Sequence, residues 1–325
     1  MWLDVAKGIA MVAIVMGHFD IGFIDRIVYP WHVPLFFVIA GFFLSRSVPA
    51  REFVGKKAKV LLLPFAFTAV AVVLTLTVKA LCCGGDVLDA FLRSLASAVY
   101  GSGSAKGATT FGADNIGAVW FLEAMFWAVL LVRFTNIWIV GALAMVSWLS
   151  ARYVWLPLNL QSGALSALFV YSGQYIYRKT ELLRATSWPF FTLGVASFLG
   201  TVAINPPIFF VKNVCSPLSI VLAVFIVYFL LTAFRWISEI CFVRVVGSAV
   251  GTNTLSILCL HSFQLKCFSL DSLWVMTPCA NWSGGRLPFY ILFLLVCNAV
   301  YFGIGILVIN SVKVLKGKLI RKGTI

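Results

Sequence analysis

The chain has 325 residues, of which 62% are apolar and only 11% are charged, and its mean hydropathy is +1.01. A soluble globular protein of this length would need far more polar surface, so the composition predicts an all-α, polytopic membrane protein with one domain over residues 1–325. The net charge of +14 is compatible with nucleic-acid binding, but we reject that function, because the basic residues fall in short loops and in the tail (311–325).

Windows of roughly 18 or more apolar residues, with some shorter ones allowed by packing, predict about ten transmembrane helices. They cover approximately residues 5–24, 31–46, 60–80, 116–133, 135–150, 157–177, 187–204, 216–234, 251–270 and 288–310. The first is expected to be a membrane helix and not a cleaved signal peptide, because it carries internal charges and lacks a small-x-small cleavage site.

The distribution of lysine and arginine predicts the orientation of these helices. With the N-terminus inside, seventeen of the 25 basic residues lie on the inner side and eight on the outer side. The eight outer residues are Arg26, Lys79, Arg93, Lys106, Arg152, Lys212, Lys266 and Arg286. The bias predicts both termini in the cytoplasm and a protein of the cytoplasmic (inner) membrane, with the basic tail as a surface anchor.

The loop between the third and fourth predicted helices contains a helical pattern of its own. The sequence DVLDAFLRSLASAVY has apolar residues at helical spacing, with Asp86 at a plausible N-cap. It predicts an interfacial amphipathic helix over 86–100, followed by the glycine- and serine-rich link GSGSAKG. This link is either a plain connector or a lid over an outer cavity.

The first predicted helix contains ionisable residues that a plain membrane anchor would avoid, namely Asp4, Lys7, His18 and Asp20. On a helix of about 100° and ~1.5 Å per residue, Lys7 and His18 differ in direction by only about 20° and lie ~16 Å apart. Asp4 falls within about 40° of the same stripe. Because ionisable groups inside a membrane are costly, this stripe is expected to face a cavity.

Further polar residues fall in or beside other predicted helices. The chain has only three histidines, of which His32 begins the second helix and His261 lies in the ninth. Glu123 lies in the fourth helix and Asn253 precedes His261. Each of these could make a structural hydrogen bond between helices. Three histidines at similar depth, with Asp20 and Glu123 nearby, instead favour a centre that transfers protons.

Two linked motifs in this region carry a resemblance to a known family. LDVAKGIAMVAIVMGH followed by YPWHVPLFFVIAGFFLS resembles the opening of the membrane acyltransferase 3 family, particularly its fucose-4-O-acetylase-like branch. The family's basic residue, ten-residue spacer and histidine fall on Lys7 and His18, and its aromatic-x-x-His motif falls on Tyr29 and His32. The sequence KKAKVLLLP resembles a further motif, with Lys57 where an arginine is usual. Weaker likenesses occur at Trp120-Phe121-Leu122 and around His261.

The resemblance implies transfer of an acyl group, usually acetyl from acetyl-CoA, to a hydroxyl of a surface glycan or a lipid-linked sugar. Asp4, Lys7 and Lys57 are expected to bind the phosphates of acyl-CoA at the cytoplasmic end. A stretched pantetheine arm is of the same order as the Lys7–His18 separation. We predict His18 as the general base, with Asp20 close by.

The other site residues are predicted with less specific roles. An oxyanion donor is needed, for which His32, His261 and Trp120 are candidates in that order. Tyr29, Trp120, Glu123 and Asn253 are expected to line the substrate site. No metal is expected, because no cysteine or histidine spacing fits a metal site. The competing hypothesis is a polysaccharide exporter or flippase without catalysis, since buried ionisable residues also mark transport routes.

Overall fold

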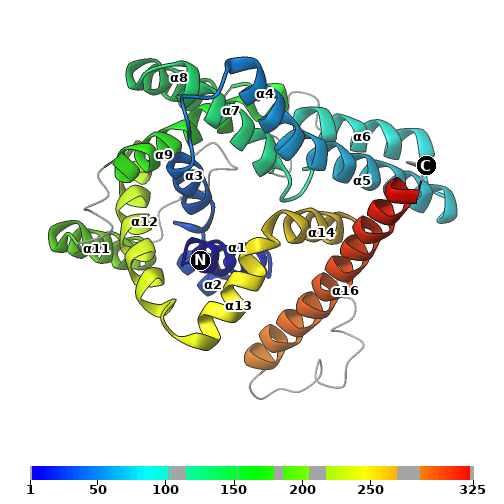
Figure 1. Ribbon diagram of the computed structural model, residues 1–325. Coiled ribbons are helices and arrows are strands. Elements are labelled where there is room, and N and C mark those ends of the chain that lie inside the picture. The colour runs from blue at the N-terminus through cyan, green and yellow to red at the C-terminus, as the bar shows by residue number, and fades with distance from the viewer. Residues whose placement is uncertain are drawn as a thin grey trace.

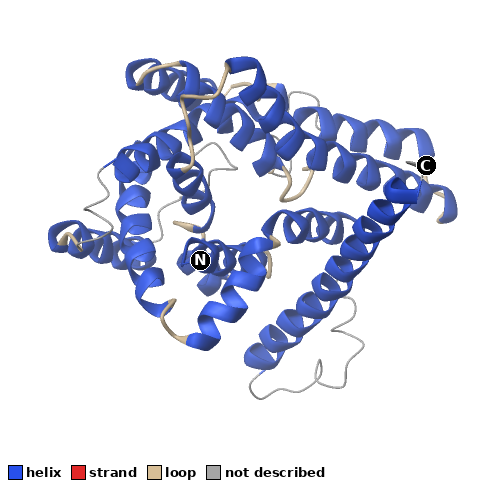
Figure 2. Ribbon diagram, viewed as in Figure 1, coloured by secondary structure: helices blue, strands red, loops and turns tan. Residues whose placement is uncertain are grey.

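The computed structural model describes residues 2–101, 103, 115–151, 153–178, 186–204, 217–268 and 286–322. Every regular element in these ranges is helical, as Figure 2 shows, which confirms the all-α prediction. The elements are α1 (Trp2–Met16), α2 (Gly22–Val28), α3 (His32–Phe42), α4 (Ala50–Lys57), η1 (Ala58–Leu62), α5 (Leu63–Cys82), α6 (Val87–Tyr100), α7 (Trp120–Phe134), α8 (Ile137–Ser150), η2 (Pro157–Asn159), α9 (Leu160–Arg178), α11 (Trp188–Ile204), α12 (Pro217–Ile237), α13 (Cys241–Thr252), α14 (Thr254–Cys267) and α16 (Arg286–Lys322).

Four described helical stretches are long and apolar enough to cross a bilayer, or five if the bent pair α13 and α14 forms one span. The four are Gly22–Phe42, Ala50–Cys82, Leu218–Ile237 and Leu287–Ser311. The protein is therefore a helical, multi-pass membrane protein. Other windows of the sequence form shorter helices, such as α8 and α11 with 14 and 17 residues. Hydropathy counts apolar windows, whereas the length of each helix depends on where its hydrogen-bond ladder ends.

The prediction of one unbroken helix over 5–24 is wrong, because α1 ends at Met16. The amides of His18 and Phe19 bond to carbonyls three residues back, at 3.1 Å each, which tightens the last turn. Asp20 then adopts φ 52°, and α2 begins at Gly22. His18 therefore lies in the turn after α1, so the helical angle expected between it and Lys7 is only approximate.

Two further boundaries differ from the predictions. The predicted helix over 251–270 is broken at Asn253, where α13 and α14 meet at a bend of 68°, and α13 itself was not predicted. The backbone of α16 stays helical to Lys322, so no break separates the last predicted span from the basic tail. The amphipathic helix is confirmed as α6, whose N-cap Asp86 accepts the Asp89 amide at 2.9 Å.

Helix α1 lies near the middle of the molecule and packs against α3, α12, α13 and α14 (Figure 1). Its contact with α13 is close because small residues face each other. A Cβ on Gly251 would come within 1.8 Å of the Asp4 carbonyl oxygen, and one on Gly8 within 2.1 Å of the Gly247 oxygen. Backbones that approach this closely are a common way for membrane helices to associate. This packing fixes the rotation of α1 about its own axis, and so it fixes the direction of the face that carries Lys7.

A second close crossing joins α3 to α9, and it leads to a stability prediction. A Cβ on Gly173 would lie 2.0 Å from the Val38 carbonyl oxygen, so Gly173→Ala forces two backbones apart. Overpacking of this kind costs about 1–3 kcal/mol. We expect the variant to unfold at a lower temperature in detergent, followed by tryptophan fluorescence. Gly200→Ala is the control, because a Cβ there has no neighbour within 4 Å. An equal fall in the unfolding temperature of both variants would contradict the close crossing of α3 and α9.

Candidate active site

Two of the three histidines are in direct contact. His18, in the turn after α1, and His261, on α14, have ring centroids 5.0 Å apart in an edge-to-face arrangement. Their nearest nitrogens, His18 Nδ1 and His261 Nε2, are 3.4 Å apart. His261 is only 1% exposed, whereas His18 is half-buried. Segments that are more than 240 residues apart in sequence thus bring two imidazoles together.

The hydrogen bonds around this pair define one consistent set of tautomers. His18 Nδ1 lies 2.8 Å from the carbonyl oxygen of Ile14, and His261 Nδ1 lies 3.3 Å from the Gln264 side-chain oxygen. A carbonyl oxygen only accepts, so we assign the proton to Nδ1 in both rings. The unprotonated His261 Nε2 then faces the His18 Nδ1–H. His18 Nε2 is left with a free lone pair, as a general base requires.

The third histidine belongs to the same region through Tyr29. The Tyr29 hydroxyl donates to the Gly17 carbonyl at 2.6 Å, next to His18, while its ring meets the His32 ring at a centroid distance of 5.2 Å. His32 Nδ1 donates to the Val28 carbonyl at 2.6 Å. Its Nε2 is therefore unprotonated in the neutral ring. The oxyanion-donor role predicted for His32 accordingly requires the imidazolium form.

A cavity of about 230 Å³, here called the Lys7 cavity, lies along the part of α1 that precedes His18. Its lining includes Lys7, Met11 and Ile14 from α1, which share one face of that helix at helical spacing. Lys57 lines it as well, together with residues of α3, α7 and α14. The carbonyl of Ile14 is the one that holds His18. Two lysines and Ile14 thus line one cavity, and Ile14 lies one helical turn before His18, although neither His18 nor His261 lines the cavity.

The lysines of this cavity are held by different partners. Lys7 Nζ forms an ion pair with Asp4 at 2.8 Å, and this hydrogen bond keeps the pKa of the Asp4 carboxyl below its ordinary value. Lys57 Nζ lies 5.6 Å from the centre of the Phe53 ring, a cation–π distance. Asp4, Lys7 and Lys57 were predicted together as an anion site. Lys7 and Lys57 do share one cavity, with Asp4 bonded to Lys7.

Lys57 is immediately followed by a π-helical turn, η1, which was not predicted from the sequence. The amide of Leu63 bonds to the Ala58 carbonyl, five residues back. Pro64 follows this turn. Because proline lacks an N–H and its ring crowds the carbonyl four residues earlier, it explains why the helix widens here into a π-turn. π-Turns often occur at functional sites. Here η1 supplies Val60 and Leu61 to the Lys7 cavity.

The structure places four other predicted residues away from this cavity. Asp20 is exposed in the turn after α1 and makes no hydrogen bond to a residue that the structure describes. Asn253 donates to the Ala249 carbonyl and lines a different cavity, between α1, α13 and α16. Trp120 and Glu123 lie on α7, both buried, but neither lines the Lys7 cavity.

Glu123 is instead part of a buried contact between α7, the end of α6 and η2. A Cβ on Gly101 would collide with Glu123 Oε2, and Asn159 donates to the carbonyls of Gly101 and Trp120, the latter at 3.1 Å. Asn159 is fully buried and has φ 52°, a position that asparagine tolerates. Asn159 was not among the residues predicted from the sequence. The Trp120 backbone is thus held by the hydrogen bond from Asn159, whereas Glu123 is held by close packing, and its buried Oε2 has no hydrogen-bond partner among the described residues.

Two residues on α14 near His261 were also missed. Gln264 lies three residues after His261 on the same helix and contacts its ring nitrogen. Ser262 Oγ accepts the amide of Val119 at 2.9 Å and so attaches the beginning of α7 to α14. The helical spacing of Gln264 from His261 was a usable signal. The partner of Ser262 was not predictable, because the two residues are 143 positions apart.

The fold and the site together define a multi-pass helical membrane protein with a histidine pair one helical turn from a mostly apolar cavity that two lysines also line. A family model described as an acyltransferase domain matches residues 1–308. The chain therefore belongs to the acyltransferase 3 family, and it is a membrane acyltransferase. No curated protein and no solved structure matches the chain.

Proposed function

We propose that this protein is an O-acyltransferase that moves an acyl group, most simply acetyl, from cytoplasmic acyl-CoA to a hydroxyl of a surface glycan or a lipid-linked sugar. The observation that supports this most strongly is that Ile14, which lines the Lys7 cavity together with both lysines, also holds His18 through its backbone carbonyl. His18, whose Nε2 is free, does not itself line the cavity and lies one helical turn beyond Ile14. Phosphates suit the lysines, and a thioester could extend along the apolar lining toward the imidazole.

In this mechanism His18 Nε2 accepts the proton of the acceptor hydroxyl as its oxygen attacks the thioester carbonyl. The C–S bond then breaks, and the proton on His18 is passed to the departing thiolate of CoA. The products are an O-acyl ester and free CoA, and His18 returns to its neutral form. His261 holds the Nδ1 side of His18, together with the Ile14 carbonyl. An acyl-histidine intermediate is not required.

The proposed orientation places both termini in the cytoplasm of a cell with this protein in its inner membrane. The excess of basic residues on the Lys7 side supports it. In that orientation Lys7 and Lys57 face the compartment that contains acyl-CoA, and the histidine pair lies toward the outside. The shorter helices would complete the predicted ten crossings by packing against the longer ones. The fucose-4-O-acetylase-like branch stays a prediction.

The proposed acceptor is tested by mass spectrometry of surface glycans from cells with and without the gene. We expect the loss of one acetyl mass, 42 Da per modified hydroxyl as a rough nominal value, in cells without it. Restoration by the wild-type gene but not by His18→Ala would link the mass change to the proposed base. If a glycan is missing from the surface instead of being unacetylated, the exporter hypothesis is favoured.

A separate prediction concerns the donor end of the site. Lys57→Gln removes a cation from the Lys7 cavity without changing the length of the side chain greatly. We expect KM for acetyl-CoA to rise about tenfold with little change in kcat, because one phosphate contact is worth roughly 1.4 kcal/mol or more. Lys56→Gln is the matched control, because Lys56 is exposed and does not line this cavity. The same KM in both variants would exclude Lys57 from donor binding.

A further inference from the structure

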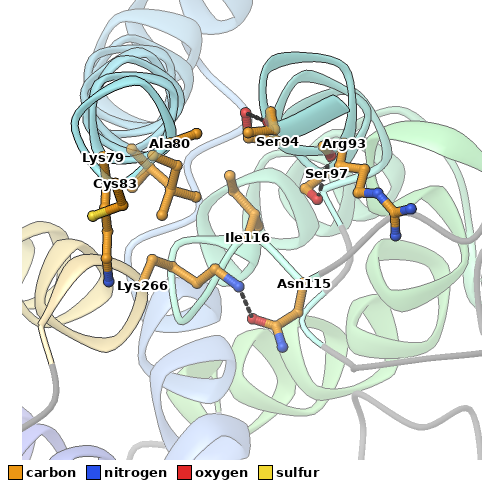
Figure 3. Close-up of a pocket in the computed structure, with 12 residues that line it drawn as sticks. Lys79, Ala80, Cys83, Arg93, Ser94, Ser97, Asn115, Ile116 and Lys266 are labelled. Carbon is orange, nitrogen blue, oxygen red and sulfur yellow. Dashed lines mark hydrogen bonds between the residues drawn. The ribbon is translucent and has the colours of Figure 1, made fainter. Parts of the chain in front are cut away.

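The cavity that Asn253 lines, between α1, α13 and α16, has no part in the mechanism above. It has a volume of about 520 Å³, within the range of sites that bind small ligands, and is here called the α16 cavity. The described residues that line it include two asparagines, Asn253 and Asn298, and no charged residue. By contrast, Lys79, Arg93 and Lys266 line the cavity between α5, α6 and α14 (Figure 3). Because burying an unpaired charge is costly, the α16 cavity suits the hydrocarbon part of an uncharged ligand.

Neither histidine lines the α16 cavity, but three of its lining residues adjoin the histidine pair. The Val15 carbonyl accepts the backbone amide of His18 at 3.1 Å. Ile257 precedes His261 by one turn of α14. The Phe302 ring, on α16, meets the His261 ring edge-on at a centroid distance of 6.0 Å. The wall of the α16 cavity thus contacts both histidines.

Helices α1 and α14 separate the α16 cavity from the Lys7 cavity. On α1, Ile14 lines the Lys7 cavity, and the next residue, Val15, lines the α16 cavity. On α14, Leu258 and Ile257 are divided between the two cavities in the same way. Successive residues of a helix point about 100° apart, so the cavities lie on different sides of these two helices. Two separate cavities next to one histidine pair fit a reaction between two substrates.

One polar atom in the wall of the α16 cavity lacks a partner. Asn298 is 3% exposed, and its side-chain nitrogen donates to the Leu294 carbonyl at 2.8 Å. Its Oδ1 is buried and accepts no hydrogen bond from a described residue. A buried acceptor without a donor is costly in free energy. The wall therefore favours a ligand that combines a hydrocarbon chain with a hydrogen-bond donor.

The α16 cavity is accessible from the side that the bilayer covers. Residues Leu287–Ser311 of α16 are long and apolar enough to cross a membrane, and they include every α16 residue of the cavity wall. Val12, Val246 and Gly303 of the same wall are exposed. A lipid can therefore enter from the bilayer, without passing through water.

We propose that the α16 cavity binds the hydrocarbon chain of a hydroxyl-bearing lipid, which is the acceptor of the acyl group, and that Asn298 Oδ1 accepts a hydrogen bond from one of its hydroxyls. This inference rests on the proposed function and selects the lipid-linked sugar as the acceptor. A sugar has several hydroxyls, so one can donate to Asn298 while another reaches His18. The acyl chain of an ordinary phospholipid has no donor and would leave Asn298 Oδ1 unpartnered.

The test is photoaffinity labelling of the full chain in phosphatidylcholine nanodiscs, without acyl-CoA. The probe is dodecyl glucoside with a diazirine in its chain, and labelled peptides are identified by mass spectrometry. Gly303→Leu fills the α16 cavity, because a Cβ on Gly303 meets no atom within 4 Å. We expect it to reduce the labelling of α1, α13 and α16 about tenfold. Gly200→Leu, on α11, is the matched control, because a Cβ there also meets no atom within 4 Å, and its labelling should equal that of the wild type.

A second variant tests the hydrogen bond separately from the space. Asn298→Leu keeps a side chain of similar size but removes the acceptor atom. Labelling by the glucoside probe should fall about fivefold, because the bond to its hydroxyl is lost. A second probe has the same diazirine chain and no hydroxyl, and Asn298→Leu should not reduce its labelling. In the wild type this alkane probe should label the cavity more weakly than the glucoside does.

Equal labelling of Gly303→Leu and Gly200→Leu would overturn the proposal, as would glucoside labelling that Asn298→Leu leaves unchanged. Equal labelling of the wild type by both probes would show that any hydrocarbon fills the cavity, and this too would overturn it. Release of CoA from acetyl-CoA is measured on unlabelled wild-type samples. Its absence would defeat the proposed function, whereas the labelling requires no acyl-CoA and is read independently. Release of CoA without labelling of the cavity would defeat this inference alone.

Discussion

His18→Ala should lower the rate of acyl transfer by about 10²–10⁴-fold while leaving a folded protein in the membrane. The reason is the assigned tautomer, in which the Ile14 carbonyl fixes the Nδ1 proton and leaves Nε2 as the base. The alanine variant should lose the base without losing much stability, because His18 lies in the turn after α1 and is only half-buried. The measurement is CoA release and acetyl transfer by purified protein in nanodiscs.

The control for this variant is Asp20→Asn, two residues away in the same turn. Asp20 is exposed and makes no hydrogen bond to the described part of the chain. The transfer rate of Asp20→Asn is therefore expected to fall far less than that of His18→Ala. The transfer rate of His18→Gln should resemble that of His18→Ala, because an amide can accept a hydrogen bond but is not a useful base. Unchanged turnover in both His18 variants would exclude the mechanism.

His261→Ala should give the second-largest effect, a fall in kcat of about 10–100-fold, by analogy with the loss seen when a group that orients a metal-binding histidine is removed. His261 Nε2 lies 3.4 Å from His18 Nδ1 and its ring packs edge-on against the His18 ring. Its loss leaves His18 in the correct tautomer but free to turn. KM for acetyl-CoA should change little, because His261 does not line the Lys7 cavity.

The double variant His18→Ala/His261→Ala separates positioning from independent catalysis. If His261 acts through His18, the double variant is no slower than His18→Ala alone, since groups that act as a unit are strongly non-additive. Multiplied losses would instead give His261 a catalytic role of its own. His261→Asn is a milder variant that keeps a polar group near Gln264, and it should be faster than His261→Ala.

The sequence was sufficient to predict the class of fold, and two of the residues that it singled out, Lys7 and Lys57, line one cavity. Composition predicted an all-helical membrane protein. The stripe predicted on the first helix is interrupted, because Lys7 lines the Lys7 cavity whereas His18 lies in the turn after α1 and does not line it. The α6 cap at Asp86 was predictable because capping is a local property of a few residues. The family was predictable because its motifs are short, linked and near the start of the chain.

What could not be predicted depends on contacts between distant segments. The pairing of His18 with His261 joins the turn after α1 to α14 across 243 positions, and no local pattern encodes it. Single turns break the helical structure after Met16 and at Asn253. Both turns lie inside apolar windows, and hydropathy alone therefore predicts unbroken helices there. Glu123 was a natural candidate for the substrate site by its charge. The packing of α7 decides which of its sides faces the Lys7 cavity, and Glu123 is not on that side.

The central claim is that one protein connects a donor on the cytoplasmic side to an acceptor on the other side through the Lys7 cavity and His18. Inside-out membrane vesicles that contain the protein, supplied externally with acetyl-CoA labelled on its acetyl group, test it directly. The mechanism predicts that label accumulates on glycan or lipid-linked sugar facing the vesicle lumen with the wild type and not with His18→Ala. Equal lumenal labelling by the two proteins, or labelling only in right-side-out vesicles, would contradict it.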